Sequence, residues 1–136
     1  MSKRCIKRFI WVITGLYLFL APVACGETEE NSLLNMVDNL YARRCESPET
    51  SRWMMEIIEE NLNAHGENPA DYELLWRAAR GYLFLGDHAE ESKEKIRLYE
   101  KGKEYAEQAT MVNSEGYEGF FYLGVLLGSI GQERGV

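Results

Sequence analysis

The chain has few cysteines, few prolines and a shortage of basic residues, and each shortage excludes a class of protein. Three cysteines in 136 residues cannot form the multi-bridge framework of a small secreted scaffold. Three prolines exclude a proline-rich linker protein. The 15 basic residues are outnumbered by 22 acidic ones, and the formal net charge of −7 argues against binding to nucleic-acid phosphates. A composition of 46% hydrophobic and 27% charged residues instead predicts one globular domain.

The N-terminus differs in composition from the rest of the chain. Residues 1–8 carry basic side chains and no acidic one, and residues 9–24 contain no charge. A positive start followed by an apolar run is typical of a secretory signal peptide. The run is shorter than the ~20 residues of a spanning helix, although a short transmembrane anchor is the alternative. We therefore expect a signal peptide at 1–24, a polar tether at 25–31 and a helical domain at 32–136.

The end of the apolar run resembles a bacterial lipobox, in which a small residue precedes a cysteine that takes up lipid. Ala24 and Cys25 fit this pattern, whereas Pro22 stands where an aliphatic residue is usual. The resemblance implies lipidation of Cys25 and membrane anchoring by its acyl chains. Cleavage before Cys25 would leave Cys45 as the single ordinary thiol, which we expect to be half-buried in a helix.

Beyond the tether, apolar residues recur at intervals of three and four, which predicts amphipathic helices and no strands. Ser47 and Asp71 are expected N-caps, and Pro48 suits a first helical turn. Breaks are expected at 66–69, 86–88 and 113–114. The predicted helices cover about 33–41, 48–65, 72–85, 89–112 and 117–130.

Two segments that lie 45 residues apart share one pattern of apolar and small residues. Small residues at Ala79 and Gly124 predict close helix approach, and Gly86 and Gly131 predict left-handed helix ends. The corresponding positions are Leu75, Ala78, Ala79, Tyr82 and Gly86 in one segment, and Phe120, Leu123, Gly124, Leu127 and Gly131 in the other.

This spacing resembles the tetratricopeptide repeat, whose standard period is ~34 residues, with the additional residues placed at 87–97. The expected fold class is all-α, a tetratricopeptide-like helical-hairpin solenoid that is short and incomplete at its C-terminus. The match covers roughly residues 50–131.

Residues 73–80, with the sequence ELLWRAAR, resemble a helix shared by two related groups. One is the T component of TRAP transporters, which are bacterial lipoproteins, and the other is the eukaryotic regulators of microtubule dynamics. The lipobox-like start favours the bacterial branch. That resemblance implies a periplasm-facing, lipid-anchored protein of the bacterial envelope that associates with a solute-binding protein. Members of the group continue for several more helices, so the chain is identified as a C-terminally truncated member.

The function that this resemblance implies is a protein-interaction module, an accessory of TRAP-type solute uptake. The alternatives are direct capture of a small, partly apolar solute in the repeat groove, and a nonfunctional fragment of a longer family member. The predicted groove residues, on the first helix of each pair, are Glu73, Trp76, Arg80, Leu83, Phe121 and Val125.

Trp76 and Arg80 are four residues apart and therefore share one helix face, where they can stack on a ligand or hold a carboxylate. The competing interpretation is that Trp76 packs in the core and Arg80 pairs with a glutamate. Arg77 lies elsewhere on the helix and is expected in a surface ion pair.

Residues 119–130 are apolar all round the predicted helix, which indicates burial on more than one side. Because one preceding helix cannot cover all of it, we expect either a truncated chain or a homo-oligomer through residues 117–131.

No catalytic constellation is visible in the sequence. It contains no HExxH, no CxxC and no glycine-rich phosphate loop. His65 and His88 both stand beside helix breaks, where exposed histidine is expected. The charged run from Glu90 to Arg97 is interpreted as a solvated helix face. We therefore expect no enzyme activity, no cofactor, no metal ligands and no nucleic-acid partner.

Overall fold

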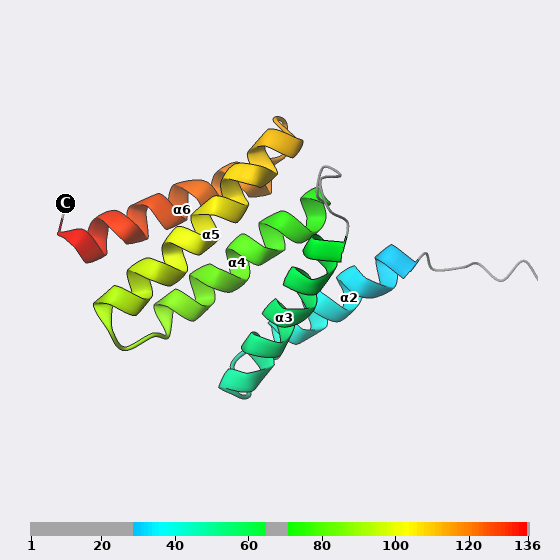
Figure 1. The fold of residues 1–136 in the computed structure, drawn as a ribbon, viewed down its shortest axis with the longest axis horizontal. Helices are drawn as coiled ribbons and strands as arrows, with labels where there is room; N and C mark the ends of the chain where they lie inside the picture. Colours follow the sequence, from blue (N-terminus) through cyan, green and yellow to red (C-terminus); the bar gives the residue numbers. More distant parts are fainter. Residues whose placement is uncertain (1–28, 65–70, 136) are drawn as a thin grey trace, which may run out of the picture.

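The structure is a computed structural model that describes residues 29–64 and 71–135. These residues form α2 (Glu29–Ala42), α3 (Pro48–Ala64), α4 (Tyr72–Asp87), α5 (Ser92–Val112) and α6 (Tyr117–Arg134) (Figure 1). No strand occurs in the described ranges, and the predicted all-α helical-hairpin fold is confirmed. The predicted signal peptide, Cys25 and His65 lie outside the described residues.

The helices are arranged side by side in chain order, from α2 at one edge of the molecule to α6 at the other (Figure 1). Each helix packs against the next one, and α4 also contacts α2 and α6. α3 and α5 pack less closely than the other neighbours and meet through side chains, among them Glu59 and Lys101. α2, α4 and α6 form one continuous layer, and α3 and α5 lie on its other side. The layer of α2, α4 and α6 carries the predicted site.

Local sequence signals set the starts of two helices. The Ser47 hydroxyl accepts a hydrogen bond from the Thr50 amide at 3.3 Å, and Pro48 begins α3. The Asp71 carboxylate accepts from the Glu73 amide at 2.9 Å at the start of α4. Both predicted caps are therefore confirmed.

The core consists of two hydrophobic clusters joined through α4 and α5. The first cluster contains buried residues of α2, α3, α4 and α5, among them Val37, Ile58 and Leu74. The second contains buried residues of α4, α5 and α6, among them Tyr99 and Leu126. The α4–α5 hairpin is thus the centre of the fold, because it contributes to both clusters.

The predicted roles of the repeat glycines are only partly correct. Ala79 is fully buried, and its carbonyl oxygen lies 3.3 Å from where a Cβ on Gly102 would stand, so close approach is confirmed there. Gly124 has open space around it instead. Within the described residues the left-handed conformation occurs at Gly135, with φ 74°, and not at Gly86 or Gly131, which lie inside helices.

Several predicted boundaries and exposures also differ. α2 begins at Glu29, so residues 29–31 form its first turn rather than a tether. α5 begins at Ser92, and 89–91 belong to the preceding loop. Cys45 is exposed in the turn between α2 and α3, not half-buried in a helix. Trp53 of α3 is 55% exposed.

The last helix is less buried than its composition predicts. Leu126 and Ile130 are buried against α4 and α5, but Phe120, Phe121 and Leu127 are each about half exposed. The described helices include none that is both long and apolar enough to be a membrane span.

Candidate functional site

Trp76 is the centre of the α2–α4–α6 surface. Its indole ring lies parallel to the Tyr122 ring of α6, with 6.1 Å between ring centroids and an interplanar angle of 1°. The indole nitrogen donates to the Glu73 carboxylate at 3.1 Å. The Phe121 ring meets the Tyr122 ring edge-on, with 5.2 Å between the ring centroids, and Phe121 remains 45% exposed. The two helices therefore present a rigid aromatic pair with one exposed aromatic beside it.

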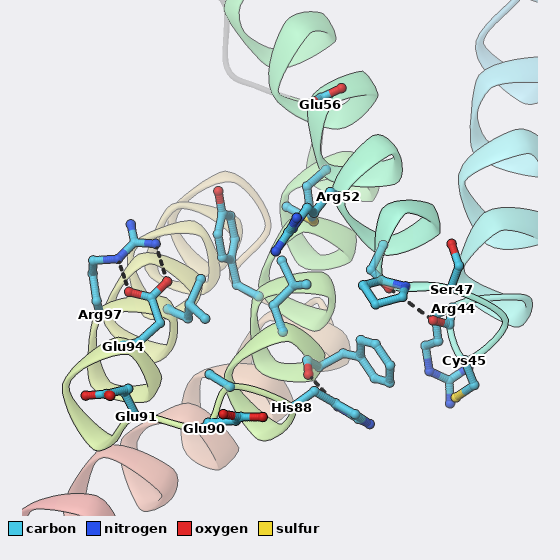
Figure 2. A pocket seen from close by; sticks show the side chains of 18 of the residues that line it. Arg44, Cys45, Ser47, Arg52, Glu56, His88, Glu90, Glu91, Glu94 and Arg97 are labelled. Atoms are coloured by element: carbon cyan, nitrogen blue, oxygen red, sulfur yellow. Dashed lines mark hydrogen bonds and ion pairs between the residues drawn. The ribbon is translucent and has the colours of Figure 1, made fainter.

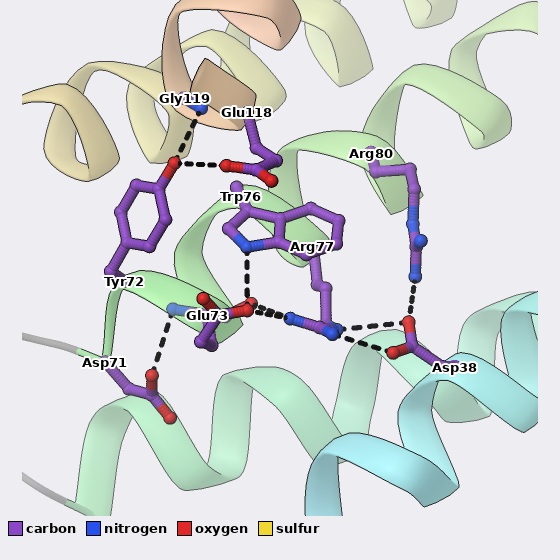
Figure 3. A network of polar contacts seen from close by, with 9 residues as sticks. All are labelled: Asp38, Asp71, Tyr72, Glu73, Trp76, Arg77, Arg80, Glu118 and Gly119. Carbon is purple, nitrogen blue, oxygen red and sulfur yellow. Dashed lines mark hydrogen bonds and ion pairs between the residues drawn. The ribbon is translucent and has the colours of Figure 1, made fainter. Parts of the chain in front are cut away.

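A network of ion pairs joins α2 to α4 beneath this aromatic pair (Figure 3). Arg77 donates to both oxygens of Asp38, at 3.0 and 2.7 Å, and to Glu73 at 2.6 Å. Arg80 donates to Asp38 at 2.6 Å, and its guanidinium lies 3.8 Å from the centroid of the Tyr41 ring. Both guanidiniums are nearly covered, with side chains 10% and 14% exposed. These two positive charges are therefore held inside the surface.

Burial and ion pairing have opposite effects on the pKa values of Asp38 and Arg77 in this network. Partial burial pushes the pKa of Asp38 upward, but hydrogen bonds and positive charge from Arg77 and Arg80 outweigh it and leave this pKa below its ordinary value. Burial likewise pushes the pKa of Arg77 down, and Asp38 and Glu73 reverse the effect and raise it. Asp38 is therefore ionised, and Arg77 is charged, at neutral pH.

Two carboxylate oxygens remain available at the aromatic pair. Glu73 uses one oxygen for Trp76 and Arg77, and Glu118 uses one for the Tyr72 hydroxyl at 2.8 Å. The other oxygen of each accepts no hydrogen bond from another described residue, although the Glu118 carboxylate is also bonded to its own backbone. Figure 3 shows Glu73 and Glu118 on either side of the Trp76 indole. The Arg77 and Arg80 guanidiniums lie 4.1 and 5.0 Å from the centroid of the Trp76 ring, so the arrangement is an aromatic pair that already holds two cations, with a negatively charged acceptor on either side.

The structure brings together some of the predicted site residues but not all of them. Glu73, Trp76 and Phe121 lie around the aromatic pair. Arg80 points to α2 and pairs with an acidic residue, as the competing interpretation predicts, although that residue is an aspartate. Trp76 is half-buried against Tyr122 rather than packed in the core. Leu83 packs against the second core cluster, and Val125 is half-buried.

Three contributors were missed by the sequence analysis, namely Asp38, Glu118 and Tyr122. Each lies on a helix other than α4, so its contact with Tyr72, Trp76 or Arg77 of α4 depends on helix packing. A weak signal existed for Tyr122, because it precedes the repeat position Leu123. Arg77, expected at the surface, is instead buried and bridges Asp38 and Glu73.

A second polar cluster lies between α3, α4 and α5. The Glu59 carboxylate accepts hydrogen bonds from Lys101 at 2.6 Å, from Tyr105 at 3.3 Å and from Tyr82. Partial burial raises the pKa of Glu59, but the donors outweigh it and hold this pKa below its ordinary value. Burial and the Glu59 charge raise the pKa of Tyr105 to about 12. Glu59 is therefore ionised at neutral pH, and its carboxylate joins α3 to α4 and α5.

A cavity of about 710 Å³ opens between α3, the end of α4 and the start of α5 (Figure 2). Its wall carries charges of both signs, and the pair Arg97–Glu94 is already joined at 2.6 Å. His88 is exposed beside it, as predicted, and is bonded to the Phe84 carbonyl at 2.8 Å. Within the described residues no group of three histidine, cysteine or acidic side chains is placed to hold a metal ion.

Comparison with known proteins places this geometry in a family. The family model for regulator of microtubule dynamics protein 1-3 matches residues 33–136, which include all five described helices except the first turns of α2. The chain belongs to this family. Two curated relatives are named regulator of microtubule dynamics protein 3. The one from Xenopus laevis is 28% identical over 110 residues, and the one from Bos taurus is 29% identical over 111.

The matched regions cover 81% and 82% of this chain but 22% of each relative. The chain therefore spans about a fifth of the length of the curated relatives that it matches.

Family membership corrects the choice between the two related groups. The chain matches the regulators of microtubule dynamics, and the relatives are animal proteins, so assignment to the T component of TRAP transporters is wrong. The predicted bacterial envelope location, lipid anchoring and role in solute uptake are wrong for the same reason. The alternatives of solute capture and a nonfunctional fragment find no support in the family. The lipobox-like Cys25, on which the bacterial choice depended, lies outside the described residues.

Proposed function

We propose that this chain is a non-enzymatic binding module of the regulator of microtubule dynamics family, whose α2–α4–α6 surface binds a basic segment of a partner protein. The observation that carries the proposal is the Trp76–Tyr122 ring pair set between Glu73 and Glu118. The Arg77 and Arg80 guanidiniums already lie 4.1 and 5.0 Å from the centroid of the indole ring, so a cation of the partner would be held chiefly by the Glu73 and Glu118 carboxylates on either side of the ring pair. An arginine or lysine side chain of the partner can donate hydrogen bonds to both carboxylates.

The charges around the site support a basic rather than an acidic partner. Arg77 and Arg80 are covered and already paired with Asp38, so they present little positive charge to a ligand. Glu73 keeps 44% of its side chain exposed. With a net charge of −7, the whole chain also attracts basic partners at long range.

The relatives' name gives this binding a context. They are regulators of microtubule dynamics, and this chain matches about a fifth of their length. We propose that the matched helices contribute to such regulation by holding a partner, and that no bond is made or broken on them.

Binding of a fluorescent arginine-rich peptide to the full chain tests the proposal. We expect Trp76→Ala to weaken binding about tenfold, or ~1.4 kcal/mol, because the indole positions both the Glu73 carboxylate and the Tyr122 ring. Trp53→Ala is the matched control, since Trp53 is exposed on α3 and makes no part of the surface. The control should bind the peptide as the unchanged chain does.

Charge is tested separately with the same peptide carrying citrulline, the neutral isostere, in place of arginine. We expect the neutral peptide to bind at least tenfold more weakly, and Glu118→Gln to weaken binding of the arginine peptide alone. Equal binding of the two peptides, or equal loss in both tryptophan variants, would contradict the proposal.

A further inference from the structure

The outer face of α6 is apolar and uncovered. Tyr117 is 68% exposed, Phe120 and Leu127 are each 52% exposed, and Phe121 is 45% exposed. α6 packs only against α5 and α4 among the described helices, and it forms one edge of the molecule (Figure 1). Large aromatic side chains in a continuous exposed row are typical of an interaction surface.

Glycines complete this row. At 100° per residue, Gly124 and Gly128 fall on the same face as Phe120, and Gly131 on the same face as Tyr117. A Cβ added to Gly124 or Gly128 would meet no atom within 4 Å, so neither glycine is required by packing within the chain. Along this face of α6 the large aromatic side chains therefore lie in the N-terminal half, and the glycines lie in the middle and in the C-terminal half. We call Tyr117, Phe120, Phe121, Gly124, Leu127 and Gly128 the α6 stripe.

We propose that the α6 stripe binds the α6 stripe of a second copy of this chain, antiparallel, around a two-fold axis at Gly124. In that register Phe120 of one copy faces Gly128 of the other, since both are four residues from Gly124. Tyr117 faces Gly131, both being seven residues away, and Phe121 faces Leu127. Each of the two most exposed rings thus meets a glycine, and Gly124 meets its own equivalent, where the helix backbones approach most closely.

Charge and area are consistent with this occupant. The stripe itself carries no charged side chain, and Glu118 on the same helix turns away to Tyr72. Two copies of an acidic chain therefore meet there without opposing like charges. From the exposed fractions, and ~150–250 Å² for a fully buried aromatic side chain, the stripe would bury roughly 500 Å² per copy. That is near the ~1,000 Å² total at which specific interfaces begin, so we expect a weak, concentration-dependent dimer.

Sedimentation equilibrium of the full chain in a mild non-ionic detergent tests the dimer. The unchanged chain should shift from monomer to dimer as its concentration rises. Gly124→Glu should remain monomeric at all concentrations, because two like charges would meet on the axis, while its helix content stays unchanged. Met111→Glu is the control, since Met111 is 76% exposed and apolar but lies on α5. All variants share residues 1–28, so any difference among them reports on the helices.

Charge exchange tests the register. Phe120→Asp alone and Gly128→Lys alone should each abolish the dimer. The double variant should restore it, because each introduced aspartate would face an introduced lysine of the second copy. A chain that stays monomeric at every concentration would overturn the proposal, and so would failure of the double variant to restore a dimer that both single variants abolish. Trp76→Ala should leave the dimer intact, so this result is independent of peptide binding.

Discussion

Gly86 and Gly124 both belong to the repeat pattern but have different surroundings. Gly86 is buried at the end of α4, where an added Cβ would overlap the ring of Tyr99. Gly124 lies in the middle of α6 with open space at its Cβ position. The first glycine is therefore required by packing, and the second costs the helix stability without improving the fold of one chain.

We expect Gly86→Ala to destabilise the fold by ~1–3 kcal/mol, the usual cost of overpacking. Gly124→Ala should stabilise it by ~0.5–1 kcal/mol, because alanine is the better helix former. Urea denaturation at a concentration where the chain is monomeric measures both values. Equal changes in the free energy of unfolding for the two substitutions would contradict the claim that packing requires Gly86 and not Gly124.

Tyr99 gives a prediction in alkaline solution. Its hydroxyl donates to Asp87 at 2.9 Å, and burial together with this carboxylate raises its pKa to about 12. The unfolded value is ~10, so the contribution of Tyr99 is complete below pH ~10 and is lost as the pH rises towards 12.

Tyr99→Phe should therefore cost about 1 kcal/mol at neutral pH, where the hydrogen bond is lost. It should also make the free energy of unfolding fall less steeply between pH ~10 and 12. Denaturant titrations at several pH values measure both effects. Parallel pH profiles for the variant and the unchanged chain would contradict the role assigned to Tyr99.

Among the elements, α2 depends most on polar contacts with its neighbour. Asp38 joins it to α4 through both Arg77 and Arg80, and the arginine side chains are nearly covered. Removing one partner of a covered ion pair leaves the other charge without compensation. Because Asp38 itself is 42% exposed, solvent screening reduces the effect.

We expect Asp38→Asn to cost ~1–2 kcal/mol at neutral pH. The pKa of Asp38 is lowered in the fold, so this stability is present above the ordinary value of ~3.9 and is lost as the pH falls through the lowered value. The variant's acid unfolding should accordingly be shallower. Amide hydrogen exchange in the variant should be faster in α2 and little changed in α6. The control Glu104→Gln, an exposed substitution on α5, should change neither the acid unfolding nor the exchange rates.

The elements differ in how far the sequence could predict them. Ser47 and Asp71 bond to amides two or three residues away, so the starts of α3 and α4 follow from local sequence. Asp38 and Tyr122 reach the site from other helices, and no spacing within α4 indicates them. Gly86 was misread for a related reason: its neighbour is Tyr99 of the next helix, and packing rather than backbone conformation requires the glycine.

At the scale of the whole molecule, the same limit separates fold from function. The repeat pattern reports on helix pairing, which many proteins share, and it predicted the all-α fold correctly. The choice of group depended on residues near Cys25, outside the helices that match the family, and it was wrong. The chemistry of the α2–α4–α6 surface could not correct it, because that surface forms only when three helices pack.

The two core clusters predict how the molecule loosens as a whole. Leu126 is fully buried in the cluster that holds α6, and Ile58 is fully buried in the cluster that holds α2 and α3. In arrays of packed helices each element is stabilised chiefly by its neighbours. A cavity in one cluster should therefore affect the helices at that end first.

We expect Leu126→Ala and Ile58→Ala each to cost ~2–5 kcal/mol. Amide hydrogen exchange should show which helices lose protection in each variant. Leu126→Ala should release the amides of α6 while α3 keeps most of its protection, and Ile58→Ala should release α2 and α3 while α6 keeps its own. The α4–α5 hairpin contributes to both clusters and should be the slowest to exchange in either variant. Uniform loss of protection along the chain in both variants would instead mean that the two clusters unfold as one unit.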